Sequence, residues 1–165
     1  TLFMPRHGSL LHHEVEVVLL IGRGGQDIPE AGALSYTAGI TLGLDLTLRD
    51  VQGRLKKLGL PWELSKAFEQ SAPLGYFKKY DPNSMDLENF SFTCSVNGGL
   101  RQQGNTRDML FPVRNLIHRL SGWWTLRPGD IIFTGTPSGV GSLKQGDQVG
   151  IESSVTGLFS WTISF

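Results

Sequence analysis

Glycine punctuates the whole chain: 21 of the 165 residues are glycine, and they fall between short apolar runs. This spacing is typical of folds built from many strands that are joined by tight turns. The dipeptide Asn97-Gly98 is a strong hairpin signal, since both residues tolerate positive φ. We therefore expect a mostly β fold with a few short helices. Strands are predicted over residues 14–21, 36–46, 92–96 with 100–102, 130–134, 148–152 and 158–163.

Two segments have the period of an amphipathic helix. The first covers about residues 51–58, where apolar side chains recur at i, i+4 and i+7 and Gly59 follows. The second begins with Pro112 and ends at Gly122, with an apolar stripe along one face. No internal repeat, low-complexity tract or linker divides the chain. The sequence therefore predicts a single domain over residues 1–165.

The charge and the cysteine content limit which classes of partner the protein can bind and in which cellular compartment we expect it. Fifteen basic residues balance fifteen acidic ones, so the chain has no electrostatic footprint for nucleic acid or for an anionic membrane surface. A small ligand is the better expectation. Cys94 is the only cysteine, which rules out an internal disulfide and suits a reducing compartment. Residues 17–21, the longest apolar run, are too few to span a bilayer, so we expect the cytoplasm or an organelle matrix.

Glu14 and Glu16 lie two residues apart in a run that otherwise reads as a core strand. Side chains two apart on a strand project from the same face, so the two carboxylates would lie side by side. Two like charges on a half-buried surface are unfavourable unless a cation lies between them. A divalent metal would satisfy both. The alternative is an edge strand that faces solvent and carries two solvated glutamates.

Asp45 is a third carboxylate, and its neighbours over several residues are apolar or small. It could be a turn or cap residue before the first helix, but Asp50 is better placed to cap that helix. Three carboxylates with no cysteine or histidine at ligand spacing favour Mg²⁺ or Mn²⁺, with Ca²⁺ as an alternative, over a structural zinc ion. His13 alternates to the opposite face, so we interpret it and His12 as packing or supporting groups.

Lys66 and a glycine-rich loop are further candidates for the site. Lys66 has apolar neighbours, and a half-buried lysine near a metal would be a fixed positive charge for a developing enolate or carboxylate. Its alternative is an ordinary surface lysine. The loop over residues 135–141 offers backbone N–H donors to an anionic ligand. It is no Walker A motif, because no Lys-Ser/Thr pair follows the glycines, which leaves a nucleotide-binding module as a minor alternative.

Five short segments in order form a pattern that none of them forms alone. They are His13-Glu14-Val15-Glu16, residues 44–52, Gly59-Leu60-Pro61-Trp62 with Ser65-Lys66, Val96-Asn97-Gly98 with Arg101-Gln102, and residues 128–130 through 135–141. This series strongly resembles the fumarylacetoacetate hydrolase family, and within it the short acylpyruvate hydrolases. The resemblance runs from about Leu11 to the C-terminus.

The resemblance implies a fold, an assembly and a set of site residues. The fold would be a mixed β-sandwich or β-roll, of the kind that forms the C-terminal domain in this family, and the assembly a homodimer. By match, the metal falls on three carboxylates: Glu14, Glu16 and Asp45. Substrate contacts fall on Gln52, Lys66, Gly135 and Thr136, with Lys66 and Gln52 in the catalytic roles.

The resemblance also implies an activity. A 1,3-diketo acid such as an acylpyruvate would chelate the metal, and water would cleave its carbon–carbon bond to give pyruvate and a carboxylic acid. Decarboxylation or tautomerisation of oxaloacetate passes through the same pyruvate-type enolate, so these activities are the nearest alternatives. A catalytically silent metal-binding scaffold is a more remote one.

The match breaks at the N-terminal end. Family members carry an upstream segment with a lid helix, whose His and Glu pair acts on the catalytic water. Residues 1–5 resemble a shortened Phe-x-Lys-Pro strand without its lysine, and the expected domain lacks the lid. We therefore expect the biological chain to be longer and the general base to lie outside these residues. His7 is the only nearby histidine, and no glutamate accompanies it at helical spacing.

Overall fold

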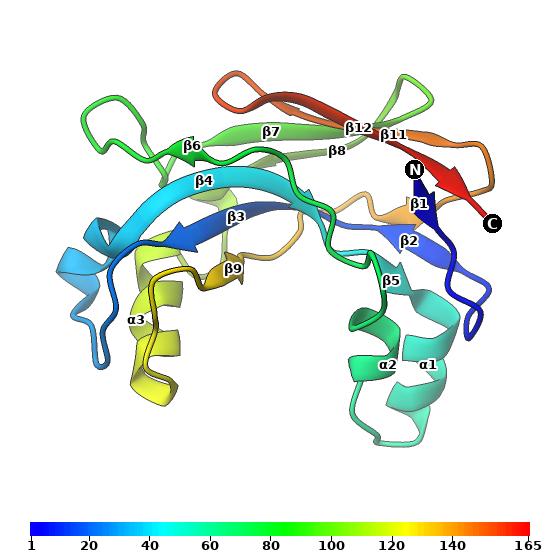
Figure 1. Ribbon diagram of the computed structural model, residues 1–165, viewed down its shortest axis with the longest axis horizontal. Helices are drawn as coiled ribbons and strands as arrows, with labels where there is room; N and C mark the ends of the chain where they lie inside the picture. Colours follow the sequence, from blue (N-terminus) through cyan, green and yellow to red (C-terminus); the bar gives the residue numbers. More distant parts are fainter.

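Two stacked β-sheets form the body of the protein, and helices lie below the lower sheet (Figure 1). This computed structural model describes all residues, 1–165. The upper sheet has the strand order β1-β12-β11-β7-β8, the lower one β6-β4-β3-β9, and a small third sheet β10-β2-β5. The strands are β1 (Leu2–Phe3), β2 (Leu11–His13), β3 (Val15–Ile21), β4 (Thr37–Leu44), β5 (Thr47–Leu48), β6 (Lys78–Lys79), β7 (Ser91–Val96), β8 (Gly99–Asn105), β9 (Ile131–Phe133), β10 (Gly141–Ser142), β11 (Gln148–Ser153) and β12 (Gly157–Ser164).

The helices are short and gather at the two ends of the curved lower sheet (Figure 1). At one end α3 packs against the 3₁₀ turn η1, and at the other end, below β5, α1 and α2 lie side by side. Their bounds are α1 (Arg49–Lys57), α2 (Glu63–Lys66) and α3 (Val113–Trp123), with 3₁₀ turns η1 (Glu30–Tyr36) and η2 (Thr106–Asp108). None of these helices has both the length and the apolar content needed to cross a bilayer.

The core fills the space between the two large sheets. Alternate residues of β3 enter it, because successive side chains on a strand point to opposite faces. They meet alternate residues of β4 and of the two central strands of the upper sheet, β7 and β11. The buried residues that form this contact include Val15, Val17, Leu19, Ile21, Leu42, Leu44, Cys94, Val96, Val149 and Ile151. The other face of β3 is therefore free to carry polar side chains.

The architecture confirms the expectation of a mostly β fold with a few short helices. Every long strand predicted from the sequence is present, with ends that differ by at most three residues. The hairpin at Asn97-Gly98 is also confirmed, since both residues have positive φ, 52° and 77°. Five strands were not predicted, because a strand of two or three residues is too short to show an alternating pattern. They are β1, β2, β5, β6 and β10. The same holds for α2, which has a single turn.

The predicted cap of α1 is wrong. Leu48 occupies the cap position and makes no side-chain hydrogen bond to the helix. Asp50 lies in the first turn, and its carboxylate accepts hydrogen bonds from the backbone N and Oγ of Ser9 and from the N of Leu10. Asp50 therefore ties the first turn of the helix to the segment before β2.

Candidate functional site

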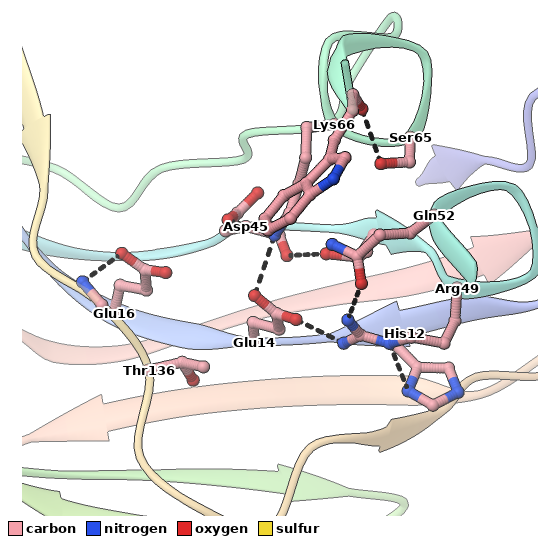
Figure 2. Close-up of polar contacts among 12 residues, drawn as sticks. His12, Glu14, Glu16, Asp45, Arg49, Gln52, Ser65, Lys66 and Thr136 are labelled. Atoms are coloured by element: carbon pink, nitrogen blue, oxygen red, sulfur yellow. Dashed lines mark hydrogen bonds and ion pairs between the residues drawn. The ribbon is translucent and has the colours of Figure 1, made fainter. Parts of the chain in front are cut away.

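Glu14, Glu16 and Asp45 converge on the face of β3 that points away from the core. Glu14 lies in the break between β2 and β3, and Glu16 follows two residues later on the same face. Asp45 directly follows β4, the antiparallel partner of β3, and its backbone N donates to the Glu14 carbonyl at 2.8 Å. Pairing of the two strands thus brings the three side chains together, and one oxygen from each lies within 4.8 Å of the others (Figure 2).

Both glutamates are buried, which excludes the alternative of a solvent-facing edge strand. Glu14 is 8% exposed and Glu16 is 4% exposed. β3 is an interior strand, paired with β4 on one side and with β9 on the other. Gly43 is the residue opposite Glu16 on β4, and a Cβ there would lie only 2.8 Å from Leu74 Cδ2. The floor of the site is therefore closely packed around the carboxylates.

Two cationic side chains reach the cluster from α1 and α2. Lys66, the last residue of α2, places Nζ 2.9 Å from Glu14 Oε2 and 2.5 Å from Asp45 Oδ2. Arg49, the first residue of α1, forms an ion pair through Nη2 with Glu14 Oε1. Figure 2 shows Glu14 between these two cations. Arg49 also donates from Nη1 to the side-chain oxygen of Gln52 at 2.7 Å.

The environment shifts the carboxyl groups in different directions. Burial raises the pKa of Glu16 to about 7, although the backbone N–H of Gly135 opposes the shift. Burial also raises the pKa of Asp45 above its ordinary value, against the hydrogen bond from Lys66. Burial acts the same way on Glu14, but the hydrogen bonds from Lys66 and Arg49 outweigh it and leave that pKa below its ordinary value. Of the three carboxylates, Glu16 is thus the one whose burial is least offset by hydrogen bonds and nearby cations.

The donor set fits a hard dication. All three candidate ligands are carboxylate oxygens, which suit Mg²⁺, Mn²⁺ or Ca²⁺ better than the nitrogen and sulfur donors of a structural zinc site. With the carboxylates ionised, Lys66 and Arg49 leave one negative charge uncompensated, and Glu16 has neither cation as a hydrogen-bond partner. A dication would remove that deficit. Ligation by these three residues stays a prediction.

The glycine-rich loop after β9 lies beside the cluster. The backbone N of Gly135, which has φ +100°, donates to Glu16 Oε2 at 2.7 Å. The hydroxyl of Thr136 donates to the Val15 carbonyl at 2.8 Å and accepts from Gln102 Nε2 at 2.8 Å. One N–H of the loop therefore binds a candidate ligand directly. The threonine hydroxyl already has two partners inside the protein.

A cavity of about 530 Å³ opens on the other side of this loop, and none of the three carboxylates lines it. Val17 and Phe92 form part of its wall, together with Gly135 and Thr136. Val17 points to the core face of β3, opposite to Glu16, so the loop separates the cavity from the carboxylates. We therefore do not include this cavity in the candidate site.

Of the residues predicted from the sequence, five form one connected group, and two reach it only through a neighbouring residue or the backbone. The contacting group is Glu14, Glu16, Asp45, Lys66 and Gly135. Gln52 is buried on α1 and meets the cluster through Arg49, whereas Thr136 is bonded to the backbone of β3. Their roles toward a substrate stay predictions.

Sequence reasoning gave no role to Arg49 or to Gln102. An arginine in the first turn of a helix is opposed by the helix dipole, and this signal could have marked Arg49 as a residue with a partner elsewhere. Gln102 had no such local signal, although Arg101-Gln102 is one of the segments that resemble the family. His13 does lie on the face opposite to the glutamates, as the alternation predicts, where its Nδ1 is 2.8 Å from Gln102 Oε1.

Known proteins share both the sequence and the fold. The family model for the fumarylacetoacetate (FAA) hydrolase C-terminal domain matches residues 1–163. Oxaloacetate tautomerase FAHD1, mitochondrial, from Rattus norvegicus is 45% identical over 161 residues, which cover 95% of this chain and 70% of that protein. Oxaloacetate decarboxylase, mitochondrial, from Dictyostelium discoideum is 45% identical over 155 residues, 94% of this chain and 70% of that protein.

A solved structure extends the agreement to three dimensions. The crystal structure of fumarylpyruvate hydrolase from Pseudomonas aeruginosa in complex with Mn²⁺ and pyruvate has a TM-score of 0.95 and 35% identity. The match covers 99% of this chain and 70% of that one. The predicted fold of this domain type is thereby confirmed. With the sequence match over residues 1–163, it places the chain in the fumarylacetoacetate hydrolase family.

Proposed function

We propose that the chain catalyses a dication-dependent reaction of a small 2-oxo acid, with tautomerisation of oxaloacetate as its main activity and decarboxylation of the same substrate beside it. The rat and Dictyostelium relatives, each 45% identical, are named for these two reactions. Their names support the oxaloacetate alternative more than the hydrolysis of acylpyruvates. Both reactions need the same event, which is the development of negative charge on the oxygen of the 2-oxo group.

The charge balance of the cluster is the observation that carries the proposal. Glu14, Glu16 and Asp45 each place one oxygen near a common point. Lys66 and Arg49 form ion pairs with two of these carboxylates. With a dication held there, the five side chains and the ion have one net positive charge. Such a site attracts the carboxylate of an oxo acid and opposes the binding of a cation.

The residues of the chain would divide the work as follows. Glu14, Glu16 and Asp45 would hold Mg²⁺ or Mn²⁺, which when bound supplies Lewis-acid stabilisation of oxygen atoms. Lys66 would stabilise the charge that develops on the substrate oxygen, because its ammonium group is fixed by two carboxylates and needs little reorganisation. Gln52, which meets the cluster through Arg49, would orient the substrate.

A panel of substrates tests the proposal. Purified protein with Mg²⁺ or Mn²⁺ is given the enol form of oxaloacetate, and decay of the enol absorbance and release of pyruvate are followed separately. We expect faster enol decay than without enzyme and loss of the acceleration with a chelator. No acceleration of either process, with dication uptake demonstrated by calorimetry, would refute the proposed function.

Hydrolysis of an acylpyruvate is the second candidate. The Pseudomonas aeruginosa enzyme supports it, since that structure is named for fumarylpyruvate hydrolysis and resembles this chain at a TM-score of 0.95. Acetylpyruvate and fumarylpyruvate belong in the same panel. A kcat/KM for either that exceeds the value for oxaloacetate would reverse the order of the two candidates.

A homodimer and a location in the cytoplasm or an organelle matrix complete the proposal. The rat and Dictyostelium relatives are named as mitochondrial. Light scattering on the purified protein would measure the mass in solution directly.

A further inference from the structure

Gln102 lies inside the sandwich, behind the carboxylate cluster, and its side-chain amide makes four hydrogen bonds. Oε1 accepts from His13 Nδ1 at 2.8 Å and from the backbone N of Val15 at 3.2 Å. Nε2 donates to Thr136 Oγ1 at 2.8 Å and to the Pro137 carbonyl at 2.9 Å. The residue is 1% exposed, so water does not compete for these groups. Both acceptor sites and both donors of the amide are used.

The backbone partners fix which way the amide points. The N–H of Val15 is only a donor, so the group that faces it must be Oε1. The carbonyl of Pro137 is only an acceptor, so the group that faces it must be Nε2. It follows that the ring of His13 carries its proton on Nδ1, because that nitrogen donates to Oε1. Flipping the amide would break both bonds to the backbone.

The oxygen side of the amide holds the segment that bears the two glutamates. Val15 lies between Glu14 and Glu16; its side chain is part of the core and its N–H donates to Gln102, while the two glutamate side chains project from the opposite face. A fixed Val15 therefore fixes the direction of both carboxylates. His13, on the other side of Glu14, is anchored at the same oxygen.

The nitrogen side holds the glycine-rich loop. Thr136 and Pro137 directly follow Gly135, whose N–H binds Glu16. The loop runs close to β8 beyond this point, since a Cβ at Gly139 would lie 2.2 Å from the Arg101 carbonyl oxygen. One amide on β8 thus joins the candidate ligands to the loop beside them.

We propose that Gln102 is a positioning residue that sets the geometry of the dication ligands and of the glycine-rich loop together. The inference rests on the proposed function for the kind of ion that the carboxylates bind. It adds a residue that touches neither ion nor substrate and acts through Val15 and Thr136. Supporting partners of this kind change metal affinity or activity by about 10- to 100-fold when they are removed.

The test replaces Gln102 by Met, which is similar in length and removes all four bonds. Mn²⁺ alone is titrated into the full chain, and exchange of the Gly135 amide hydrogen is followed by NMR without metal. We expect Mn²⁺ affinity to fall by about 10- to 100-fold and the Gly135 amide to exchange faster. The matched control is Gln103→Met on the same strand, where the side chain is exposed and makes no hydrogen bond. Both quantities should stay at the wild-type values in the control.

A second variant guards against misfolding. Gln102→Glu keeps an acceptor for Val15 and His13, and burial favours its protonated form, which leaves one donor toward Thr136 and the Pro137 carbonyl in place of two. Mn²⁺ affinity should therefore stay nearer to wild type while the Gly135 amide still exchanges faster. A folded Gln102→Met protein with unchanged Mn²⁺ affinity and unchanged exchange would overturn the inference. Neither measurement contains an oxo acid, so failure of wild-type turnover would count against the proposed function alone. If the wild type takes up no Mn²⁺, the proposed function fails. The exchange rate of the Gly135 amide in Gln102→Met then decides whether Gln102 positions the loop.

Discussion

Nζ of Lys66 lies 2.9 Å from Oε2 of Glu14, which joins the end of a four-residue helix to the break between two strands. The same ammonium group contacts Asp45, so one side chain bridges a carboxylate at the start of β3 and one just after β4. At 27% exposure it is accessible from the open side of the site. A lysine in this position can neutralise a ligand set and also meet a substrate.

Replacing Lys66 by Ala tests that second role. We expect kcat for the oxo-acid reaction to fall by about 100-fold or more, since a preorganised charge of this kind is worth as much as a lost oxyanion donor. Lys57→Ala is the control, because that lysine is exposed at the end of α1 and forms no ion pair. Steady-state kinetics, together with Mn²⁺ titration of both variants, gives the answer. Unchanged turnover with intact Mn²⁺ binding would exclude Lys66 from catalysis.

Metal affinity should depend on pH through Glu16. Its pKa is about 7 in the folded, metal-free protein and near 4.5 when unfolded, so the folded state holds this proton more tightly. Its contribution to the stability of the metal-free protein is therefore present below about pH 4.5 and lost as the pH rises through about 7. A dication must displace the proton, so the increase in Tm caused by Mn²⁺ should be larger at about pH 8 than at about pH 6. An equal increase at both pH values would contradict this.

Neutralising the same side chain should separate stability from binding. In Glu16→Gln the amide oxygen can still accept from the Gly135 N–H, while the buried charge is gone. We expect the metal-free variant to be more stable than wild type at pH 8, by up to about 3 kcal/mol, and to bind Mn²⁺ more weakly. Urea unfolding and calorimetry measure the two effects. Glu152→Gln, at an exposed position on β11, should change neither.

Cys94 should be inert while the protein is folded. Burial raises the pKa of its thiol to about 12, and the sulfur lies inside the sandwich with His13 Nδ1 at 3.9 Å. The reactive thiolate is thus almost absent at neutral pH. Reaction with a thiol reagent should be undetectable in native buffer and complete in denaturant. Fast labelling of the native protein would mean that β7 opens readily or that the thiol is exposed.

Much of the fold could be predicted because its signals are local. Alternating or continuous apolar runs mark β3, β4, β7, β11 and β12, and glycine marks the turns between them. The pairing of Glu14 with Glu16 was also visible, since it needs only the two-residue period of a strand. The contact of Asp45 with Glu14 depends on the register of β3 against β4, and an apolar environment around an aspartate was the only hint.

Gln102 shows where such reasoning stops. A regular two-residue hairpin at Asn97-Gly98 would place Arg101 opposite Cys94, and so direct it into the core. The structure has a register shift between Cys94 and Ser95, which pairs Cys94 with Gln102 instead. One irregular residue pair thus exchanges an arginine for a glutamine in the interior. No periodic pattern in the sequence predicts this register shift between β7 and β8.

The acidic and basic halves of the site belong to different parts of the architecture. The carboxylates lie on or next to the paired strands β3 and β4, whose opposite face packs in the core. Their spacing should therefore persist as long as the sandwich stays folded. Arg49, Lys66 and Gln52 belong to α1 and α2, which lie below β5 of the small third sheet (Figure 1). We therefore expect that exchanging residues 49–66 between relatives would replace the two cations and Gln52 while the three carboxylates keep their places on the strand side of the site.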